Sequence, residues 1–430
     1  MRKFFIAVSV AFAAVMSMNA QTGAWTGKLK VSGVELVLIF NIGEESATLD
    51  VPDQGAKEIP VEVSRDAVGG ITLSVPAINA SFKGLWAGKM IVGTFTQHGM
   101  SFPMTLTPGV QVMNRPQTPV GPFPYATEEV SFTNGDAVLK GTLTLPENCD
   151  RNTPVLVMVT GSGLQNRDEE AFGHKPFAVI ADAFAKAGIA TLRYDDRGFG
   201  ESTGDVVFCT TEDLKNDALS GVKLLRERFD IVGVIGHSEG GTIALMLASE
   251  KQVDFAISLA GMIVSGAETL LDQNRQACQA AGLPDSEVDA YCRLLSDTFD
   301  AVKTKSPLPS VDNYDLSDAL RQNYAQVLNQ FQSPYMKYFI GLDLSGSLAG
   351  ITCPVMALNG TKDTQVQCER NLDVLKSGLS SGGKNLIKAE VGLNHLFQHC
   401  ATGAFSEYKE IEETISPEVL SEMIAWIKAL

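Results

Sequence analysis

The feature that most constrains this chain is a serine set among glycines at the end of an apolar run. Residues 232–235 form a β-type apolar run, Ser238 follows shortly after it, and residues 243–248 resume as a helix-like apolar stretch. Gly236 and Gly240 stand two residues to either side of the serine, as expected where the chain turns so sharply that a Cβ has no room. The pattern predicts a strained strand-to-helix turn that lifts the Ser238 hydroxyl clear of a sheet and directs helix amides at it. An ordinary glycine-rich turn with a solvent-facing serine is the alternative, so the chain must also supply partners for the serine.

Two polar residues follow later predicted strands in suitable positions. Asp363 comes just after the apolar residues 355–358, and His395 follows a predicted strand at residues 385–390 and a glycine turn. The carboxyl ends of parallel strands meet at one edge of a sheet, where ligand sites gather. The chain order serine, aspartate, histidine is one in which catalytic triads occur. The sequence therefore predicts a catalytic triad of Ser238, Asp363 and His395.

Other residues compete for two of these roles. His399 is the alternative base, but no strand and glycine turn lead directly into it. Asp343 precedes the strand at residues 355–358 and Asp373 lies in the helix predicted after it, so both are weaker candidates for the acid. His237 is held beside the serine, and we expect its side chain to face away from the position that a base must occupy.

The first part of the chain is predicted to form an all-β domain. A chain of 430 residues exceeds what one hydrophobic core usually holds, which favours two domains. Residues 21–112 carry short alternating apolar runs that are separated by Gly, Pro, Asp and Asn, with no helical period between them. This pattern predicts a small antiparallel barrel or a curved meander. Residues 113–125 contain four prolines and are predicted to be a linker, because they suit neither a helix nor a central strand.

The rest of the chain is predicted to be an α/β domain. Strands and helices alternate through residues 126–430, which predicts a mainly parallel sheet with helices on both faces. Arg197 lies in a polar turn, where we expect it to pair with a carboxylate and brace the loop. Residues 263–340 depart from the alternation and are expected to form a helical cap over a pocket, or else a dimer surface. Amphipathic helices are expected there at residues 268–281, 286–304 and 316–337.

The N-terminus and the overall charge limit where the protein works and what it binds. Residues 1–20 combine a basic start, an apolar stretch and a small residue at Ala20, which predicts a cleaved signal peptide. The mature protein is then expected in the periplasm or outside the cell, without a lipid anchor because no cysteine follows the cut. The net charge of -16 argues against a nucleic-acid partner. No later stretch is long and apolar enough to predict membrane insertion.

The cysteines and histidines give little indication of a metal or cofactor. Seven cysteines are present, and in an oxidising compartment some of them can pair, with Cys278 and Cys292 as the first pair to test. None of them has the spacing of a zinc site. His395 and His399 stand four residues apart, but no third ligand lies nearby in the sequence. We therefore expect neither a metal ion nor a cofactor.

Over residues 126–430 the chain resembles the α/β-hydrolase superfamily. It is most similar to bacterial carboxylesterases grouped with the serine aminopeptidase-like hydrolases, several of which are secreted and carry an N-terminal β domain. The resemblance implies an α/β-hydrolase fold with a helical cap, and it implies that the backbone amides of Ser162 and Glu239 form the oxyanion hole. It rests on Gly236-His237-Ser238-Glu239-Gly240-Gly241, on Thr160-Gly161-Ser162-Gly163, where the fuller esterase signature has histidine in place of Thr160, and on Asn166-Arg167-Asp168.

The expected activity is hydrolysis of a carboxylic ester through a Ser-His-Asp triad and an acyl-enzyme intermediate. A serine aminopeptidase or other peptidase on the same fold is the first alternative, since Glu239, Asp168 or Glu169 could bind a free amine. A catalytically inert protein that binds a glycan or lipid is the second alternative. The expected substrate is a small-molecule or glycan-linked ester, and the sequence leaves its acyl group, its alcohol and the oligomeric state open.

Overall fold

The chain folds as two compact units, Met1–Val112 and Met113–Leu430. The division falls at the start of the proline-rich segment. The signal peptide expected at residues 1–20 lies outside the described residues. The computed structural model describes residues 22–31, 34–44, 46–54, 56–66, 69–97, 99–110, 114–379 and 384–430.

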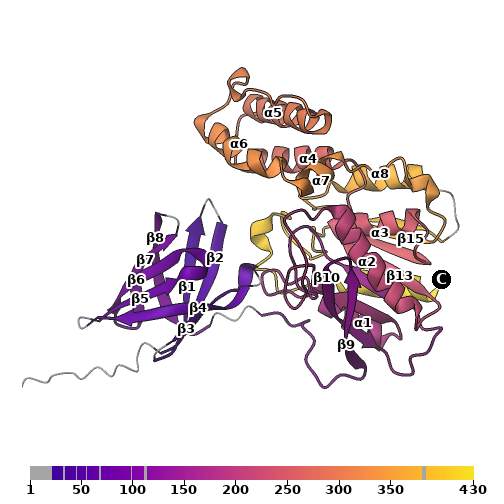
Figure 1. Cartoon of the computed structure of the whole chain (residues 1–430), viewed down its shortest axis with the longest axis horizontal. Coiled ribbons are helices and arrows are strands. Elements are labelled where there is room, and N and C mark those ends of the chain that lie inside the picture. Colours follow the sequence, from indigo (N-terminus) through magenta and orange to yellow (C-terminus); the bar gives the residue numbers. More distant parts are fainter. Residues whose placement is uncertain are drawn as a thin grey trace, which may run out of the picture. The chain divides into compact units, whose positions relative to one another are not determined.

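The first unit is a closed antiparallel barrel in which each strand pairs with its neighbours in the chain (Figure 1). The last strand returns to the first, where Thr26 lies opposite Thr107, and this pairing closes the barrel. Leu49, Leu73 and Phe82 point inward and are fully buried, so the alternating sequence encloses its own core. Of the two expected forms, the structure has the barrel. Its strands are β1 (Gly23–Val31), β2 (Val34–Ile42), β3 (Ala47–Val51), β4 (Ala56–Arg65), β5 (Gly70–Val75), β6 (Ala80–Ala87), β7 (Met90–Gln97) and β8 (Met100–Pro108).

The second unit is built on an eight-stranded sheet in the order β16-β15-β14-β13-β11-β12-β10-β9. In chain order the first two strands, β9 and β10, form an antiparallel hairpin that turns between Asn134 and Ala137. The strands from β11 to β16 run parallel to one another. The central strands are buried along their whole length, which explains their continuous apolar sequences. The strands are β9 (Ala126–Asn134), β10 (Ala137–Leu145), β11 (Val155–Val159), β12 (Ala190–Tyr194), β13 (Val232–His237), β14 (Phe255–Leu259), β15 (Val355–Gly360) and β16 (Leu386–Glu390).

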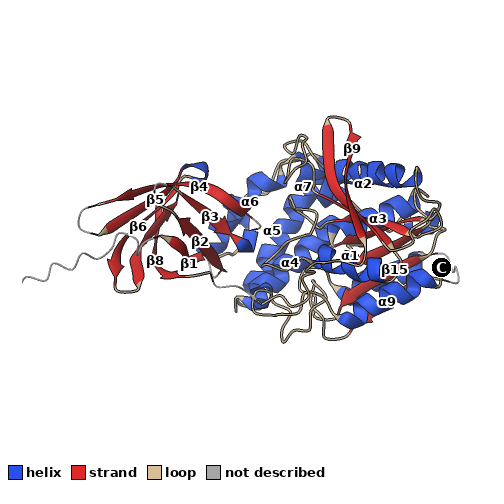
Figure 2. Ribbon diagram, turned by 90° about the horizontal axis from the view of Figure 1, so that it is seen from below, coloured by secondary structure: helices blue, strands red, loops and turns tan. Residues whose placement is uncertain are grey.

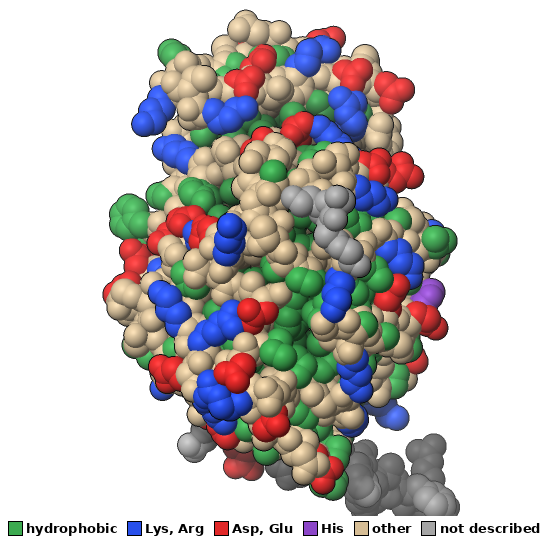
Figure 3. Space-filling view, turned by 90° about the vertical axis from the view of Figure 1, so that its right-hand side faces the viewer, with side chains coloured by type: hydrophobic (Ala, Val, Ile, Leu, Met, Phe, Trp, Pro, Cys, Tyr) green, Lys and Arg blue, Asp and Glu red, His purple; other side chains and the backbone are tan. Residues whose placement is uncertain are grey.

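Helices cover both faces of this sheet, which is the α/β-hydrolase architecture that the resemblance implied (Figure 2). One face packs against α1 and α9 and the other against α2, α3 and α8. Among the described helices, none is long and apolar enough to cross a membrane. Acidic and basic side chains are interspersed on the face shown in Figure 3. The helices are α1 (Pro176–Lys186), α2 (Thr211–Arg226), α3 (Glu239–Ser249), α8 (Cys368–Gly378) and α9 (Pro417–Lys428).

A helical cap with its own hydrophobic core is inserted between β14 and β15. The single helix predicted over residues 316–337 is wrong, because the chain forms two helices there. Ser333 caps the second of them by accepting the amide of Met336, and Pro334 cannot continue a preceding helix because it has no N–H group. The cap helices are α4 (Gly266–Ala280), α5 (Asp285–Thr304), α6 (Asp318–Phe331) and α7 (Pro334–Gly341).

Two arginines fasten loops of the second unit. Arg197 and Asp217 form a buried ion pair with an N–O distance of 2.6 Å, which confirms the expected brace. In the segment predicted as a linker, Arg115 donates to the backbone oxygens of Phe172 and Ile411, each at 2.8 Å. The start of this segment is therefore fastened to other loops of the second unit.

Candidate active site

Ser238 occupies the sharp turn between β13 and α3. Its backbone has φ 54° and ψ -119°, a strained conformation for a residue with a side chain. A Cβ added to Gly236 would lie 1.9 Å from the backbone oxygen of Gly240, and one added to Gly240 would lie 2.0 Å from that of Val159. The prediction that neither glycine has room for a Cβ is therefore confirmed.

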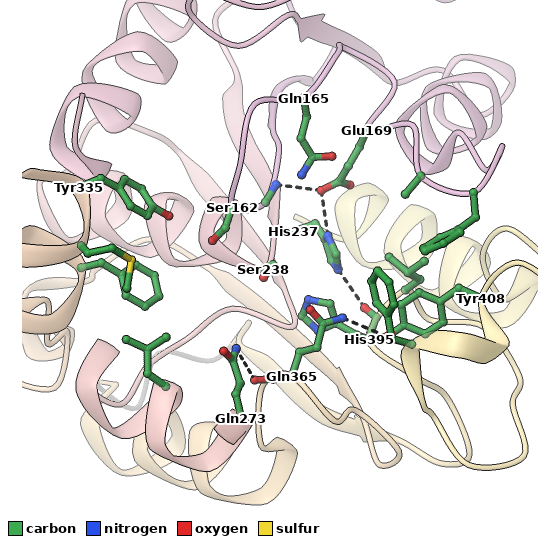
Figure 4. Close-up of a pocket in the computed structure, with 18 residues that line it drawn as sticks. Ser162, Gln165, Glu169, His237, Ser238, Gln273, Tyr335, Gln365, His395 and Tyr408 are labelled. Carbon is green, nitrogen blue, oxygen red and sulfur yellow. Dashed lines mark hydrogen bonds and ion pairs between the residues drawn. The ribbon is translucent and has the colours of Figure 1, made fainter. Parts of the chain in front are cut away.

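His395 and Asp363 lie together after the ends of β16 and β15. The Nδ1 atom of His395 is 2.7 Å from Oδ2 of Asp363, and both side chains are buried. The other carboxylate oxygen, Oδ1, accepts the amides of Gln365 at 2.7 Å and Val366 at 2.9 Å. The aspartate is thus fixed on one side by the backbone and holds the imidazole on the other. The His395 ring and Ser238 line one pocket (Figure 4).

The competing residues are not brought into this pocket. The side chain of His399 is 59% exposed, and its Nδ1 atom bonds to Glu413 at 2.9 Å. Asp343 and Asp373 are exposed outside the pocket. Of the candidate residues, Ser238 and His395 line the pocket, and Asp363 is bonded to His395.

The loop after β11 passes directly over the serine. A Cβ on Gly161 would lie 3.1 Å from the Cβ of Ser238, and the next residue, Ser162, lines the pocket. Asp196 braces this loop by accepting the Thr160 hydroxyl and the Gln165 amide, each at 2.8 Å. Burial, together with the nearby carboxylates, raises the pKa of Asp196 to about 8. Glu239 starts α3 directly after the serine, so the two amides implied for the oxyanion hole belong to segments that meet at Ser238.

A buried pair lies beside the serine in Figure 4. The two ring nitrogens of His237 face Oε1 of Glu169 and the backbone oxygen of His395, both at 2.9 Å. A carboxylate and a carbonyl oxygen are both acceptors, so an imidazolium, which has two N–H groups, donates to both of them, whereas a neutral ring can donate to only one. Burial alone would lower the pKa of His237, but the charge of Glu169 and these hydrogen bonds raise it above its ordinary value. Glu169 also accepts the Gly161 amide at 2.9 Å, so the pair joins the oxyanion loop to the His395 loop.

Helix α7 of the cap is tied to the elbow through Glu239. The carboxylate of Glu239 accepts the Thr211 hydroxyl at 2.6 Å and the Tyr335 hydroxyl at 2.5 Å. Burial and the charge of Glu239 raise the pKa of Tyr335 well above its usual value, so the phenol keeps its proton. One turn on, Tyr338 donates to Glu212 at 2.9 Å. These bonds hold one wall of the pocket in place.

The pocket has a volume of about 340 Å³ and a largely neutral lining. Apart from histidine, the charged side chain in the lining is Glu169, which His237 and Gly161 already occupy. The other polar side chains are amides and hydroxyls. The pocket is lined by Gly161, Ser162, Gln165, Glu169, Ala171, Phe172, His237, Ser238, Leu270, Gln273, Tyr335, Met336, Phe339, Gln365, His395, Leu396, Phe405 and Tyr408.

The carboxylates considered as anchors for an amine all have partners of their own. Asp168 forms ion pairs with Arg193 and Lys175. Glu169 faces His237, and Glu239 accepts two hydroxyl groups. A substrate amine would therefore have to displace an existing contact to reach any of them.

Neither a disulfide nor a metal cluster contributes to this site. All seven cysteines are free thiols, so the pairing considered for Cys278 and Cys292 is not formed, although both lie buried on the neighbouring helices α4 and α5. Within the part of the chain that the structure describes, no group of three or more potential ligands could hold a metal ion.

Sequence reasoning did not identify the roles of Glu169, Asp196 and Tyr335. Their contacts join residues far apart in the chain, 68 positions for the pair of Glu169 with His237 and 96 for that of Tyr335 with Glu239. The one local signal was His237, an ionisable residue inside an otherwise apolar strand, which needs buried partners.

Comparison with known proteins places this chain among hydrolases. The family model for X-Pro dipeptidyl-peptidase (S15 family) matches residues 134–387, more than half of the chain. Esterase EstD of Thermotoga maritima is 30% identical over 281 residues, which are 64% of this chain and 61% of EstD. The mitochondrial palmitoyl-protein thioesterase ABHD10 of Mus musculus is 27% identical over 46% of this chain and 57% of its own length. The chain thus matches less than two thirds of each of these relatives.

Solved structures with similarity to this chain include two esterases. Pyrococcus furiosus esterase Pf2001 is 18% identical, with 75% of this chain and 98% of that chain covered and a TM-score of 0.46. Est1E from Butyrivibrio proteoclasticus is 16% identical, with 70% of this chain and 99% of that chain covered and a TM-score of 0.39.

Proposed function

We propose that this chain, which belongs to the X-Pro dipeptidyl-peptidase (S15) family and is a serine hydrolase with the α/β-hydrolase fold, cleaves carboxylic esters. The neutral lining of the pocket carries this proposal. A peptidase that removes residues from an N-terminus must bind a free ammonium group, and burying that charge without a partner is costly. The carboxylate in the lining, Glu169, is already engaged by His237. An ester places no such charge in the pocket.

The proposed mechanism uses the three triad residues in turn. His395 accepts the Ser238 proton while the serine oxygen bonds to the acyl carbon, and Asp363 stabilises the imidazolium that forms. The amides of Ser162 and Glu239 donate to the resulting oxyanion. The bond from carbon to the alcohol oxygen then breaks, and the alcohol leaves with the proton held by His395. Water attacks the acyl-enzyme through the same histidine, which releases the acid and restores the serine hydroxyl.

The test is a substrate panel with a matched pair of histidine variants. The panel holds p-nitrophenyl esters, aminoacyl p-nitroanilides and an X-Pro p-nitroanilide. We expect the natural enzyme to turn over the esters. In His395→Ala kcat should fall by about a thousandfold or more. In His399→Ala, which removes an exposed imidazole, kcat should change by less than about twofold. Turnover of the anilides in place of the esters would make this chain a peptidase. Loss of activity in His399→Ala alone would reject His395 as the base.

We also propose that residues 1–20 direct export and are removed, and that the mature enzyme acts in the periplasm or outside the cell without a nucleic-acid partner. The basic start and apolar stretch support export, and the net charge of -16 with interspersed surface charges supports the absence of a nucleic-acid partner. N-terminal sequencing of protein recovered from the periplasm should begin at Gln21. A retained Met1 in that fraction would contradict the cleavage.

A further inference from the structure

The pocket has two chemically different sides, and Ser238 lies between them. In Figure 4 Tyr335 lies on one side of the serine, whereas His395 and Tyr408 lie on the other. The first side belongs to the cap helices α4 and α7, and the second belongs to loops of the sheet domain. The substrate orientation inferred from this arrangement rests on the proposed ester hydrolysis.

The chemistry of the reaction assigns one part of the ester to each side. The leaving alcohol must take a proton from His395, so its oxygen has to lie on the His395 side of the scissile carbon. The acyl group is bonded to the same carbon and points away from the leaving oxygen. It is therefore directed toward the cap.

Besides the Tyr335 hydroxyl and the Gln273 amide, which donates to the backbone oxygen of Gln365 at 2.9 Å, the cap side offers apolar contacts and no charged side chain. Leu270 on α4 and Met336 and Phe339 on α7 line the pocket there. The hydroxyl of Tyr335 is already donated to Glu239 at 2.5 Å. A charged acyl group on this side would lose its water without gaining a counter-charge. An uncharged apolar acyl group gains affinity as each methylene is buried, by about fourfold per group.

The opposite side carries a cluster of three aromatic rings. Phe172 lies with its ring centroid 4.9 Å from that of Phe405, and Tyr408 lies 5.3 Å from Phe405. Phe405 is 52% exposed, although the two rings that support it are buried. Such a supported and exposed ring offers a flat surface to another ring. Gln365, which donates to the Tyr408 hydroxyl at 3.1 Å, adds a neutral amide beside it.

We propose that Leu270, Met336 and Phe339 form the acyl subsite and that Phe405 forms the alcohol subsite. The substrates are then esters of an uncharged apolar acid with an alcohol that presents the flat face of a ring. Both an aromatic ring and the apolar face of a sugar have this chemistry, so the experiment includes one alcohol of each kind.

Two substrate series separate the two subsites. The first keeps p-nitrophenol as the leaving group and varies the acyl group through acetyl, butyryl, hexanoyl, octanoyl and the charged succinyl. The second keeps acetyl and varies the alcohol through ethanol, benzyl alcohol and the 6-hydroxyl of methyl glucoside. For the natural enzyme we expect butyryl to exceed succinyl in kcat/KM by about tenfold or more. We also expect at least one of the ring alcohols to exceed ethanol.

Matched variants then assign each preference to a side chain. Met336→Trp fills the acyl subsite, and Lys337→Trp adds the same ring at the next position of α7, which is exposed. We expect Met336→Trp to lower the ratio of octanoyl to acetyl turnover by about tenfold or more and Lys337→Trp to leave that ratio unchanged. Phe405→Ala should lower the ratio of ring-alcohol to ethyl acetate turnover by about fivefold or more. The control Phe208→Ala, which removes a ring that is 70% exposed outside the pocket, should not alter it.

The outcomes distinguish failure of the subsites from failure of the proposed function. If Met336→Trp changes alcohol preference and Phe405→Ala changes acyl preference, the orientation is reversed. Folded variants, checked by circular dichroism, that alter neither ratio would overturn the assignment, as would a preference for succinyl. If the natural enzyme hydrolyses neither series while an active-site serine probe still labels it, ester hydrolysis itself is rejected.

Discussion

The imidazolium form of His237 has two N–H groups that face two acceptors, and we predict that its loss of a proton limits activity at alkaline pH. One acceptor is Glu169, which also holds the Gly161 amide, and the other is the backbone oxygen of His395. A neutral imidazole has only one N–H group and must release one of the two acceptors. Because the pKa of His237 is raised, the imidazolium and both contacts persist above the ordinary pKa of 6.5.

Glu169→Gln should move the alkaline limit of activity to lower pH. The substitution removes the charge that raises the pKa of His237, so burial lowers that pKa and the ring loses its proton earlier. The stability that the raised pKa contributes is fully present below about pH 6.5 and is lost as pH rises through the folded value. We therefore expect the natural protein to have a higher melting temperature than Glu169→Gln, and we expect this difference to be larger at about pH 6 than at about pH 9. The pH profile of kcat/KM and melting curves at both pH values measure these effects.

A matched control separates this effect from the loss of any carboxylate. Glu413→Gln removes the partner of His399, which is exposed and outside the pocket. Its pH profile should coincide with that of the natural enzyme. An alkaline limit that stays in place in Glu169→Gln would show that the charge of His237 does not hold the site together.

At the scale of elements, the proline-rich segment supports loops that line the pocket, although its described residues, 114–125, form no helix or strand. The guanidinium of Arg115 donates to the backbone oxygens of Phe172 at 2.8 Å, Lys409 at 2.9 Å and Ile411 at 2.8 Å. Phe172 and the neighbour of Lys409, Tyr408, belong to the aromatic cluster beside the serine. The segment thus fastens together the two loops that carry this cluster.

Arg115→Ala should weaken the binding of ring alcohols more than it slows the chemical step. Without the guanidinium the two loops lose the donor that they share. We expect KM for benzyl acetate to rise by about threefold or more in Arg115→Ala, with a smaller change in kcat, because the hydrogen bonds that hold Asp363 and His395 do not involve Arg115. Steady-state kinetics measure both constants.

The comparison variant is Arg151→Ala, which removes an exposed arginine that pairs with Asp230 on the surface. It should leave KM unchanged, since an exposed ion pair contributes little. A fall in kcat with constant KM in Arg115→Ala would contradict the assigned role and would point to disturbance of the triad.

At the scale of the whole molecule, the parts that could be predicted are those with a local sequence pattern. Apolar runs that alternate with helices predicted the sheet, and Gly236 and Gly240 predicted the elbow around Ser238. The break before Pro334 also had a local signal, a serine cap followed by proline, which the amphipathic period across it concealed.

The remaining contacts depend on segments that meet only in the folded chain. Arg115 reaches Ile411 across 296 positions, and no pattern near either residue indicates that contact. The sequence made Glu169 a candidate anchor for an amine, whereas in the folded chain its carboxylate is bonded to His237. Composition identified residues 113–125 as unsuited to regular structure, but it could not indicate which unit they would bind.

The measurement that tests the central claim most directly is covalent labelling by a fluorophosphonate probe, followed by peptide mass mapping. A serine activated by a histidine reacts with such a probe, whereas an ordinary surface serine does not. We predict one adduct per chain on Ser238, no adduct in Ser238→Ala, and a greatly slowed reaction in Asp363→Asn, in which the His395 tautomer is no longer held. An adduct on another serine, or labelling of Ser238→Ala equal to that of the natural protein, would contradict the account.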